Sequence, residues 1–391
     1  MTPAGTVIIG AGQGGLQLAA SLRQAGHSGP VTLVGAEDGL PYQRPPLSKA
    51  FLLDGRAEAL ILRPAAFFAS KDITYLPGHR AEAIDRAART VTLHHAGGRR
   101  VLPYDHLVLA TGSRNLVPPL PGADTALGLR SMVDARALRA RLADARRVAV
   151  IGAGFIGLEF AAVARGLGLE VAVIEAAPRP MVRTLSAPMA ATLADWHRAQ
   201  GSVLHLGRAA AEVDRGVVLE DGRHIPADLV VIAAGVRPRT ELAEAAGLEV
   251  ADGIRVDGRL LTRDPAISAF GDCASVPSAR TGRHLRLESV QAATDQARLI
   301  AARIAGGAPA DYAALPWFWS DQGACKLQIA GHAGPGAEDR VLAPGTVARI
   351  DEHGLAAIET LNNPRTHMAA RRHLSSPPDG DGALLDRIIA A

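Results

Sequence analysis

The sequence contains little cysteine. Cys273 and Cys325 are the two cysteines among 391 residues, and they lie far apart in the chain. They form no Cys-x-x-Cys pair, so neither a disulfide framework nor a zinc or iron-sulfur centre is encoded. We therefore expect no metal site and a reducing, cytoplasmic location.

Long apolar runs are absent as well. No stretch reaches the roughly 18 uninterrupted apolar residues that a membrane-spanning helix needs, and the first residues lack the basic and apolar regions of a signal peptide. We expect a soluble protein with no membrane partner.

Lysine is scarce, occurring only at Lys49, Lys71 and Lys326, so arginine carries almost all the positive charge. The formal net charge is +3, because 42 basic residues nearly balance 39 acidic ones. A net charge this close to zero argues against a nucleic-acid partner, which requires a concentrated basic surface. It still allows a local arginine patch that faces an acidic protein.

Length and composition indicate a globular chain with more than one domain. Apolar residues make up 48% of the sequence, aromatic residues 4%, and 391 residues exceed what one core usually supports. A proline-rich stretch at 118–121 and Pro238 place crossovers near residues 115 and 240. We predict a discontinuous first domain, a second domain and a small third domain, at 1–114 with 245–314, 115–244 and 315–391.

An internal repeat is the most informative feature, and it relates residues 6–34 to residues 147–175. Each copy has an apolar strand, a Gly-Ala-Gly turn, an Ala-rich helix and a second β-branched strand. Each is followed later by a strand that ends in glycine and a basic residue, at 107–114 and 229–237. The repeat predicts an α/β fold with two Rossmann-like dinucleotide-binding domains.

The C-terminal region has a different pattern. It contains Trp317 and Trp319, alternating segments around 341–361 and an arginine-rich helix candidate at 366–374. A Pro-Asp-Gly sequence at 378–380 predicts a loose turn. We expect a small α+β domain here.

The first copy of the repeat carries a G-x-G-x-x-G fingerprint at Gly10, Gly12 and Gly15. Glycine there allows a tight turn, close approach to a pyrophosphate and tight helix-strand packing, and the helix N-terminus offers unpaired N–H groups. Glu37 is the candidate for the adenosine ribose hydroxyls. Because Gly35 stands where an acid often stands, a solvated loop charge is the alternative interpretation of Glu37.

The second copy repeats the fingerprint at Gly152, Gly154 and Gly157. Its second strand ends directly in Glu175. A carboxylate there accepts hydrogen bonds from both ribose hydroxyls and repels a 2′-phosphate, which favours NADH over NADPH. Arg179 and Arg183 lie nearby, and service to a phosphate is their alternative role.

Two dinucleotide sites in one chain predict a bound flavin, FAD, that takes hydride from NADH. A nicotinamide gives two electrons together, whereas a flavin can release them singly. The two fingerprints do not by themselves identify the acceptor.

Six short segments bear on that question. They read PYQRPPLSK at 41–49, ATG at 110–112, GFIGLE at 154–159, GDCA at 271–274, ESVQ at 288–291 and PWFWSDQ at 316–322. In this order, over nearly the whole chain, they resemble the FAD-dependent ferredoxin reductases of bacterial cytochrome P-450 and aromatic-ring oxygenase systems. Only residues 334–345 and the final stretch look shorter. The resemblance implies a glutathione-reductase-like fold, FAD and NADH as cofactors, and a 2Fe-2S ferredoxin as partner.

The resemblance also implies two active-site residues. It places residues 44–49 over the flavin and pairs Lys49 with Glu159 near the flavin ring, where a fixed ammonium favours the anionic reduced flavin. The alternatives are a surface lysine and, for Glu159 in the first turn of a helix, an acid that complements the helix dipole.

Further cofactor contacts follow from the same resemblance. Those for FAD are Arg44, Pro45, Thr111, Gly112, Arg130, Asp272, Val290, Gln291 and Trp319. On the NADH side, Arg183 and Gly235 join the second fingerprint. The alternatives are a turn-forming Asp272, a solvated Arg130 and a core Trp319, and Cys273 is interpreted as a small buried hydrophobe.

The missing cysteines narrow the choice of acceptor. Disulfide reductases of this plan need a cysteine pair beside the flavin, and the related peroxidases and oxidases need one cysteine in the region of 45–49. Neither is present, so electrons must leave the flavin directly, which suits a one-electron protein acceptor. Candidate steering residues for an acidic ferredoxin are Arg280, Arg283, Arg286, Arg365, Arg371 and Arg372; a solvated arginine-rich face is the alternative.

We therefore predict an NADH:ferredoxin oxidoreductase that supplies a cytochrome P-450, as a monomer or weak homodimer. A reductase for a ring-hydroxylating dioxygenase, for rubredoxin or for monodehydroascorbate is the first alternative. An NADH-sensing flavoprotein with a binding role is the second.

Overall fold

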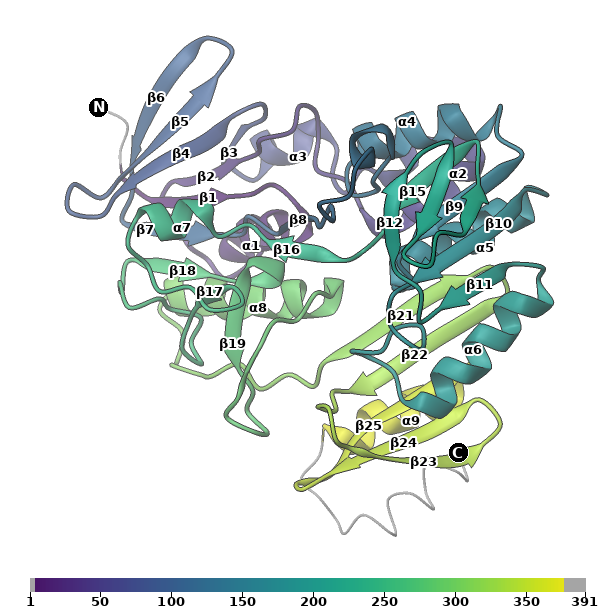
Figure 1. The fold of residues 1–391 in the computed structure, drawn as a ribbon. Helices are drawn as coiled ribbons and strands as arrows, with labels where there is room; N and C mark the ends of the chain where they lie inside the picture. The colour runs from purple at the N-terminus through teal and green to yellow at the C-terminus, as the bar shows by residue number, and fades with distance from the viewer. Residues whose placement is uncertain (1–3, 376–391) are drawn as a thin grey trace. The chain divides into compact units, whose positions relative to one another are not determined.

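The computed structural model describes residues 4–375, which divide into two compact units (Figure 1). The first comprises residues 4–43, 58–114 and 237–314, and the second comprises 44–57, 115–236 and 315–375. The turn predicted at 378–380 lies outside the described residues. The division into three domains remains a prediction.

A five-stranded parallel sheet forms the centre of the first unit, in the order β18-β7-β1-β2-β3. Its strands are β1 (Thr6–Ile9), β2 (Val31–Val34), β3 (Ile73–Leu76), β7 (His106–Leu109) and β18 (Ile267–Ala269). They are short and largely apolar, as expected for a parallel sheet covered on both faces. Helices α1 (Gln13–Gln24) and α8 (Val290–Ile304) pack against each other.

Smaller elements complete the first unit. Antiparallel strands β4 (Arg80–Asp85), β5 (Thr90–His95) and β6 (Gly98–Pro103) form one sheet, and β17 (Ile254–Arg255), β19 (Ala274–Pro277) and β20 (His284–Leu285) form another. The short helices are α3 (Ala65–Ser70), α7 (Glu241–Ala245) and the 3-10 turn η4 (Gly271–Cys273).

The second unit repeats the parallel plan in the order β11-β10-β9-β15. These strands are β9 (Arg147–Ile151), β10 (Glu170–Glu175), β11 (Val203–Leu206) and β15 (Leu229–Ile232), accompanied by helices α4 (Met132–Leu142), α5 (Phe155–Gly166) and α6 (Ala187–Ala199). The predicted duplication of a βαβ unit is therefore confirmed.

The remaining elements of the second unit outside its C-terminal region are short. They are the sheet of β12 (Ala210–Val213), β13 (Gly216–Leu219) and β14 (His224–Pro226), the 3-10 turns η1 (Pro45–Ser48) and η3 (Ala123–Thr125), and helix α2 (Ala50–Asp54). The 3-10 turn η2 (Ala57–Leu60) and the strands β8 (Ser113–Asn115) and β16 (Val236–Pro238) lie at chain crossovers.

The C-terminal region folds as a five-stranded antiparallel sheet with one helix. The sheet order is β21-β22-β25-β24-β23, from β21 (Trp317–Gln322), β22 (Cys325–Gly331), β23 (Glu338–Ala343), β24 (Thr346–Asp351) and β25 (Gly354–Leu361). Helix α9 (Pro364–Leu374) packs on β22 and β25. The predicted α+β character is confirmed.

Several helices begin at the polar residues that the sequence provides. Ser131 opens α4 with a reciprocal capping box to Asp134, and the side chains of Ser186, Ser289 and Asn363 cap α6, α8 and α9. Among the described residues, no helix is long and apolar enough to cross a membrane.

Candidate active site

The predicted FAD residues of the first unit gather at one edge of its parallel sheet. Ile9 of β1 lies between Val34 of β2 and Leu109 of β7, and Leu109 pairs with Ala269 of β18. These four strands, which Figure 1 shows side by side, therefore end together. The segments that follow them carry Gly10, Glu37, Thr111, Gly112 and Asp272. This carboxyl edge is where open α/β sheets bind ligands.

Two glycines of the first fingerprint are required by the protein itself. Gly10 has φ +113°, and a Cβ added there would lie 2.1 Å from the carbonyl oxygen of Ala110. A Cβ on Gly15 would lie 1.9 Å from the carbonyl oxygen of Gly10. Neither position accepts a side chain, which explains the tight turn and the close helix-strand packing.

Gly12 is different, because packing within the protein does not require it. Its backbone is extended, with φ −77° and ψ −166°, and no atom of the described residues lies within 4 Å of an added Cβ. A side chain would instead fill space in front of the N-terminus of α1. The turn thus fits a group that must approach the backbone closely, such as a dinucleotide pyrophosphate.

The second fingerprint has the same construction. Gly152 has φ +109° and an added Cβ would lie 2.4 Å from the carbonyl oxygen of Ala233, while one on Gly157 would lie 2.1 Å from that of Gly152. The middle glycine, Gly154, is again the open one, with its nearest neighbour at 4.0 Å. Both turns therefore pass the same test of fit for a dinucleotide.

Glu175 ends β10 and lies against the second glycine turn. Its carboxylate accepts hydrogen bonds from the backbone N–H of Ala153 at 2.7 Å and of Ala177 at 2.9 Å. Gly235 follows β15, which pairs with β9, and an added Cβ there would be 3.6 Å from Nη2 of Arg183. The structure thus places Glu175 beside the turn and Arg183 beside Gly235.

Arg179, the other basic residue near this turn, is engaged by its own loop. Its guanidinium donates to the carbonyl oxygens of Leu185 at 2.7 Å and Val182 at 3.2 Å. These contacts give Arg179 a structural role in holding the loop that follows β10.

Glu37 lies two residues beyond the position that corresponds to Glu175, and the structure explains the offset. Gly35 holds that position, where an added Cβ would come within 2.9 Å of the Cβ of Ala11. An acid therefore does not fit directly after β2. The Glu37 carboxylate accepts a hydrogen bond from the hydroxyl of Tyr42 at 2.5 Å, a contact that spacing alone did not reveal.

The other predicted FAD residues of the first unit occupy turns and a helix start. Gly112 has φ +68° and open space at its Cβ position, while the Thr111 hydroxyl donates to the carbonyl oxygen of Arg239 at 2.7 Å. Asp272 lies in η4 and accepts a hydrogen bond from Ser113 at 2.9 Å. Val290 and Gln291 begin α8, as predicted.

Lys49 and Glu159 form an ion pair in the second unit, with Nζ and Oε2 2.8 Å apart. Glu159 is 5% exposed. Its Oε2 also accepts from the Ser48 hydroxyl at 2.5 Å, and its Oε1 accepts from the Ser320 hydroxyl at 2.7 Å. Neither serine was predicted from the sequence to contact Glu159.

Two expectations about this pair need correction or refinement. The placement of Glu159 in the first turn of its helix was wrong, because the first turn of α5 contains no acidic residue. Glu159 therefore does not serve to complement the helix dipole there. Lys49 is not a surface lysine, since its side chain is 20% exposed and its Nζ also donates to the carbonyl oxygen of Pro45 at 3.3 Å.

The last predicted FAD residues, Arg44, Arg130 and Trp319, also lie in the second unit. Arg44 donates to the carbonyl oxygen of Arg130 at 2.6 Å, just before the capping box of α4. Trp319 is partly exposed and its ring centroid lies 5.5 Å from that of Trp317. It is therefore not an enclosed core tryptophan.

Family comparisons agree with this geometry. A model described as pyridine nucleotide-disulphide oxidoreductase matches residues 5–297, and one described as reductase C-terminal matches residues 317–383. The chain belongs to the pyridine nucleotide-disulphide oxidoreductase family. Members of this family use FAD and NAD(H), in agreement with the predicted cofactors.

This oxidoreductase is similar to proteins of known role. It is 44% identical to rhodocoxin reductase of Rhodococcus erythropolis, over 95% of this chain and 89% of the relative. A solved ferredoxin reductase for the CYP199A2 system from Rhodopseudomonas palustris is 45% identical, with a TM-score of 0.90 and 95% of each chain covered. The covalent putidaredoxin reductase-putidaredoxin complex gives 35% identity and a TM-score of 0.92, covering 100% of this chain and 99% of that chain.

The cysteines of the oxidoreductase are both free and buried. Burial raises the pKa of the Cys273 thiol, and raises that of Cys325 to about 11. Such thiols are poor nucleophiles. Among the described residues, no group of three or more His, Cys, Asp or Glu side chains is arranged to hold a metal.

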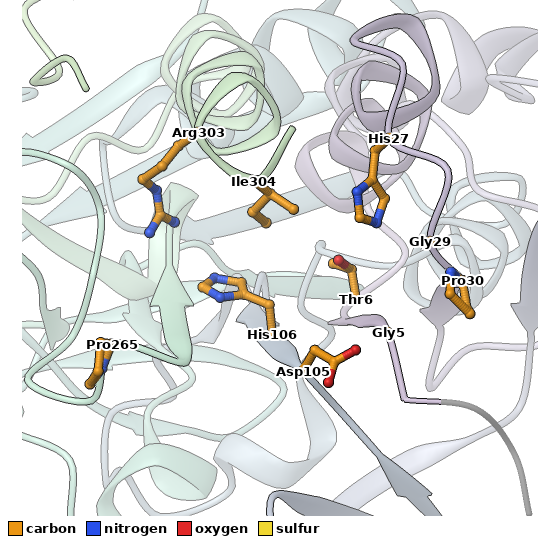
Figure 2. A pocket seen from close by; sticks show the side chains of 10 residues that line it. All are labelled: Gly5, Thr6, His27, Gly29, Pro30, Asp105, His106, Pro265, Arg303 and Ile304. Carbon is orange, nitrogen blue, oxygen red and sulfur yellow. The ribbon is translucent and has the colours of Figure 1, made fainter. Parts of the chain in front are cut away.

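A pocket in the first unit lies away from the predicted site (Figure 2). Its lining includes Thr6 and His106, which begin β1 and β7, so it opens at the amino ends of the strands. The glycine turn lies at the opposite edge. None of the predicted site residues lines this pocket, and we do not assign the cofactor to it.

The predicted arginine patch is partly wrong. The side chain of Arg286 is 9% exposed and forms ion pairs with Asp252, at 3.1 Å, and with Glu288. Arg286 is therefore engaged by acidic residues of its own unit. On α9, Arg365 and Arg372 are exposed, and the Arg371 guanidinium stacks over the Trp317 ring at 4.0 Å.

Proposed function

We propose that the chain is an FAD-containing reductase that takes electrons from NADH and passes them singly to a 2Fe-2S ferredoxin, which supplies a cytochrome P-450. The observation that carries this proposal is the pair of glycine turns. In each turn the outer glycines are demanded by packing and the middle one, Gly12 or Gly154, faces open space. Two such turns provide for two dinucleotides, the flavin in the first unit and the nicotinamide in the second.

Glu175 supports NADH as the electron donor. Its carboxylate is already oriented by the Ala153 and Ala177 N–H groups, beside the turn that would hold the pyrophosphate. An oriented carboxylate can accept hydrogen bonds from the two hydroxyls of an adenosine ribose, whereas a 2′-phosphate would meet like charge. The engagement of Arg179 by loop carbonyls removes one of the two arginines that favoured a phosphate.

Lys49 and Glu159 supply the charged groups of the proposed active site. FAD, when bound, accepts two electrons from NADH and can release them one at a time. The Lys49 ammonium is fixed by Glu159 and by the Pro45 carbonyl, so it offers a positive charge in a constant place. A fixed charge stabilises developing negative charge better than one that must first reorient.

The properties of the two thiols support direct electron transfer from the flavin to the partner. Cys273 and Cys325 are buried with raised pKa values, and the segment from Pro45 to Lys49 contains no sulfur. The chain therefore has no residue suited to a covalent sulfur intermediate. The reductases it resembles are named for ferredoxin partners, and one is bound to putidaredoxin.

The exposed face of α9 suits an acidic ferredoxin. Arg365 and Arg372 are exposed there, and Arg371 covers Trp317. Basic residues around an aromatic side chain provide both steering and a contact surface for an acidic protein.

The proposal is tested with purified holoprotein, NADH and a panel of ferredoxins, by following cytochrome c reduction. We expect NADH to reduce the flavin, NADPH to do so much more slowly, and a ferredoxin of a P-450 system to raise the rate at least tenfold. Flavin reduction with no acceleration by any ferredoxin would instead indicate the NADH-sensing role. Faster turnover with a dioxygenase ferredoxin or rubredoxin would reassign the partner.

A further inference from the structure

A chain of buried hydrogen bonds extends from Glu159 to the far end of helix α6. Glu159 Oε1 accepts from the Ser320 hydroxyl at 2.7 Å, and Ser320 Oγ accepts from Gln322 Nε2 at 3.2 Å. Gln322 Oε1 lies 2.7 Å from Nε2 of His197. Ser320, Gln322 and His197 are each fully buried, and all four residues belong to the second unit.

The chemistry of the groups fixes the direction of every hydrogen bond in this chain. A carboxylate only accepts, so the Ser320 proton must point at Glu159. Ser320 can then only accept from Gln322, which orients the amide with its oxygen toward His197. The ring must therefore carry its proton on Nε2. Burial lowers the pKa of His197, which keeps the ring neutral, and its Nδ1 is buried without a partner.

All the donors consequently point toward one carboxylate. Ser320 donates to Oε1, while Ser48 and Lys49 donate to Oε2. Hydrogen bonds in such a chain polarise one another, since each donor is strengthened by the bond that it accepts. Glu159 is thus held in one orientation, and its negative charge is partly offset by the hydrogen bond that Ser320 donates to Oε1.

Strand β21 is built to make this connection. Successive residues of a strand point to opposite faces, so Phe318, Ser320 and Gln322 share one face. The ring centroid of Phe318 lies 4.3 Å from that of Phe155 on α5, which seats the strand beside Glu159. The packing of α5 on β21 thereby fixes the distance from Glu159 to Ser320.

We propose that Ser320, Gln322 and His197 are positioning residues for the Lys49–Glu159 pair, and that they tune how readily the bound flavin accepts electrons. This inference rests on the proposed function, which places Lys49 beside the flavin. Removing a donor from Oε1 leaves more negative charge on Glu159. That charge draws on Lys49 more strongly and leaves less positive charge to favour the anionic reduced flavin.

The main test is Ser320→Ala in the FAD-loaded protein. We expect the rate of flavin reduction by NADH to fall about three- to tenfold, which corresponds to the loss of one ordinary intramolecular hydrogen bond. The midpoint potential of the bound flavin should become more negative, while the Kd for NADH stays unchanged. Gln322→Leu should shift both quantities in the same direction by less.

Two controls separate positioning from folding. Ser320→Thr keeps the hydroxyl and should restore the wild-type rate and potential. Ser202→Ala removes a buried hydroxyl that has no hydrogen-bond partner, and should change neither. An unchanged potential in Ser320→Ala, or an equal loss in Ser320→Thr, would overturn the inference.

Glu159→Gln tells this inference apart from the proposed function. If Glu159→Gln alters the potential and the NADH rate but Ser320→Ala does not, only the positioning role fails. If neither variant alters the potential or the NADH rate, the pair does not face the flavin and the proposed arrangement of the active site fails.

Discussion

Nζ of Lys49 and Oε2 of Glu159 lie 2.8 Å apart, although 110 positions of sequence separate the two residues and the lysine directly follows a short 3-10 turn. The pair combines one buried carboxylate with one of the few lysines in the chain. A buried carboxylate that holds a single ammonium in place is expected where the positive charge takes part in the chemistry.

Replacing Lys49 with methionine tests that task. We expect the rate of flavin reduction by NADH to fall about 10- to 100-fold, because a fixed positive charge is lost while Glu159 stays buried. Stopped-flow absorbance of the bound flavin measures the rate. Lys71→Met, at an exposed position, serves as the matched control and should leave it unchanged. A wild-type rate in Lys49→Met would contradict the assignment.

The middle glycines can be tested separately from the fold. Gly12→Ala should leave the unfolding free energy of the apoprotein within about 0.5 kcal/mol of wild type, since the added Cβ meets no described atom and the backbone is extended. The amount of FAD retained on purification should fall at least tenfold.

Gly154→Ala makes the corresponding change in the second turn, and should weaken NADH binding while FAD is retained. Gly15→Ala is the steric contrast, because its Cβ would lie 1.9 Å from a carbonyl oxygen. It should destabilise the apoprotein by about 1–3 kcal/mol. Full FAD occupancy in Gly12→Ala would refute the proposed location of the pyrophosphate.

Glu175→Gln should weaken NADH binding about tenfold or more, by analogy with loss of hydrogen bonds to a charged group. NADPH binding should weaken less or improve, because the charge that opposes a 2′-phosphate is gone. Fluorescence titration of each nucleotide gives the two Kd values. Glu170→Gln, at the exposed start of the same strand, should change neither. Equal weakening for both nucleotides would argue for a purely structural Glu175.

Stability should fall with acidification because of a half-buried histidine in the first unit. Burial, with a contribution from Arg303, lowers the pKa of His106 from 6.5 to about 4. The unfolded chain therefore binds this proton more readily than the folded chain. The contribution of neutral His106 to the free energy of unfolding is fully present above pH 6.5. It is lost as the pH falls toward 4, at about 1.4 kcal/mol per pH unit.

Denaturant titrations at pH 7.5, 5.5 and 4.5 measure this loss. His106→Gln should reduce the pH dependence, whereas His353→Gln, which changes an exposed histidine, should retain it. Identical pH profiles for His106→Gln and wild type would show that His106 does not govern the acid limb.

Charge reversal on α9 tests the partner surface. Arg365→Glu combined with Arg372→Glu should raise the KM for ferredoxin about tenfold at low salt, with a smaller effect at high ionic strength. Reduction of ferricyanide by NADH should be unaffected. Arg198→Glu, on the exposed side of α6, provides the control. An unchanged KM would locate docking elsewhere.

Local sequence patterns predicted the parts of the fold that depend on local chemistry. The two βαβ units follow from the alternation of β-branched strands, glycine turns and Ala-rich helices. The duplicated fingerprints were equally visible, because the outer glycines of each turn meet their steric partners within the same small motif or just after the adjacent strand.

Contacts between distant segments were not predictable in the same way. The donors from Ser320 and Ser48 to Glu159 depend on how α5, β21 and η1 pack, and no spacing in the chain encodes those distances. The same reason explains Arg286, whose ion pair with Asp252 joins residues far apart in sequence. Gly35 showed the opposite effect, since crowding by Ala11 excluded an acid where the motif suggested one.

The alternation along β21 also limits how this segment can evolve. Trp317 and Trp319 share one face, and Ser320 and Gln322 share the other. Inserting or deleting one residue would exchange the two sets, turning indole rings toward Glu159 and hydroxyl and amide groups away from it. We therefore expect the length of this strand to tolerate change far less than the identity of any one of its side chains.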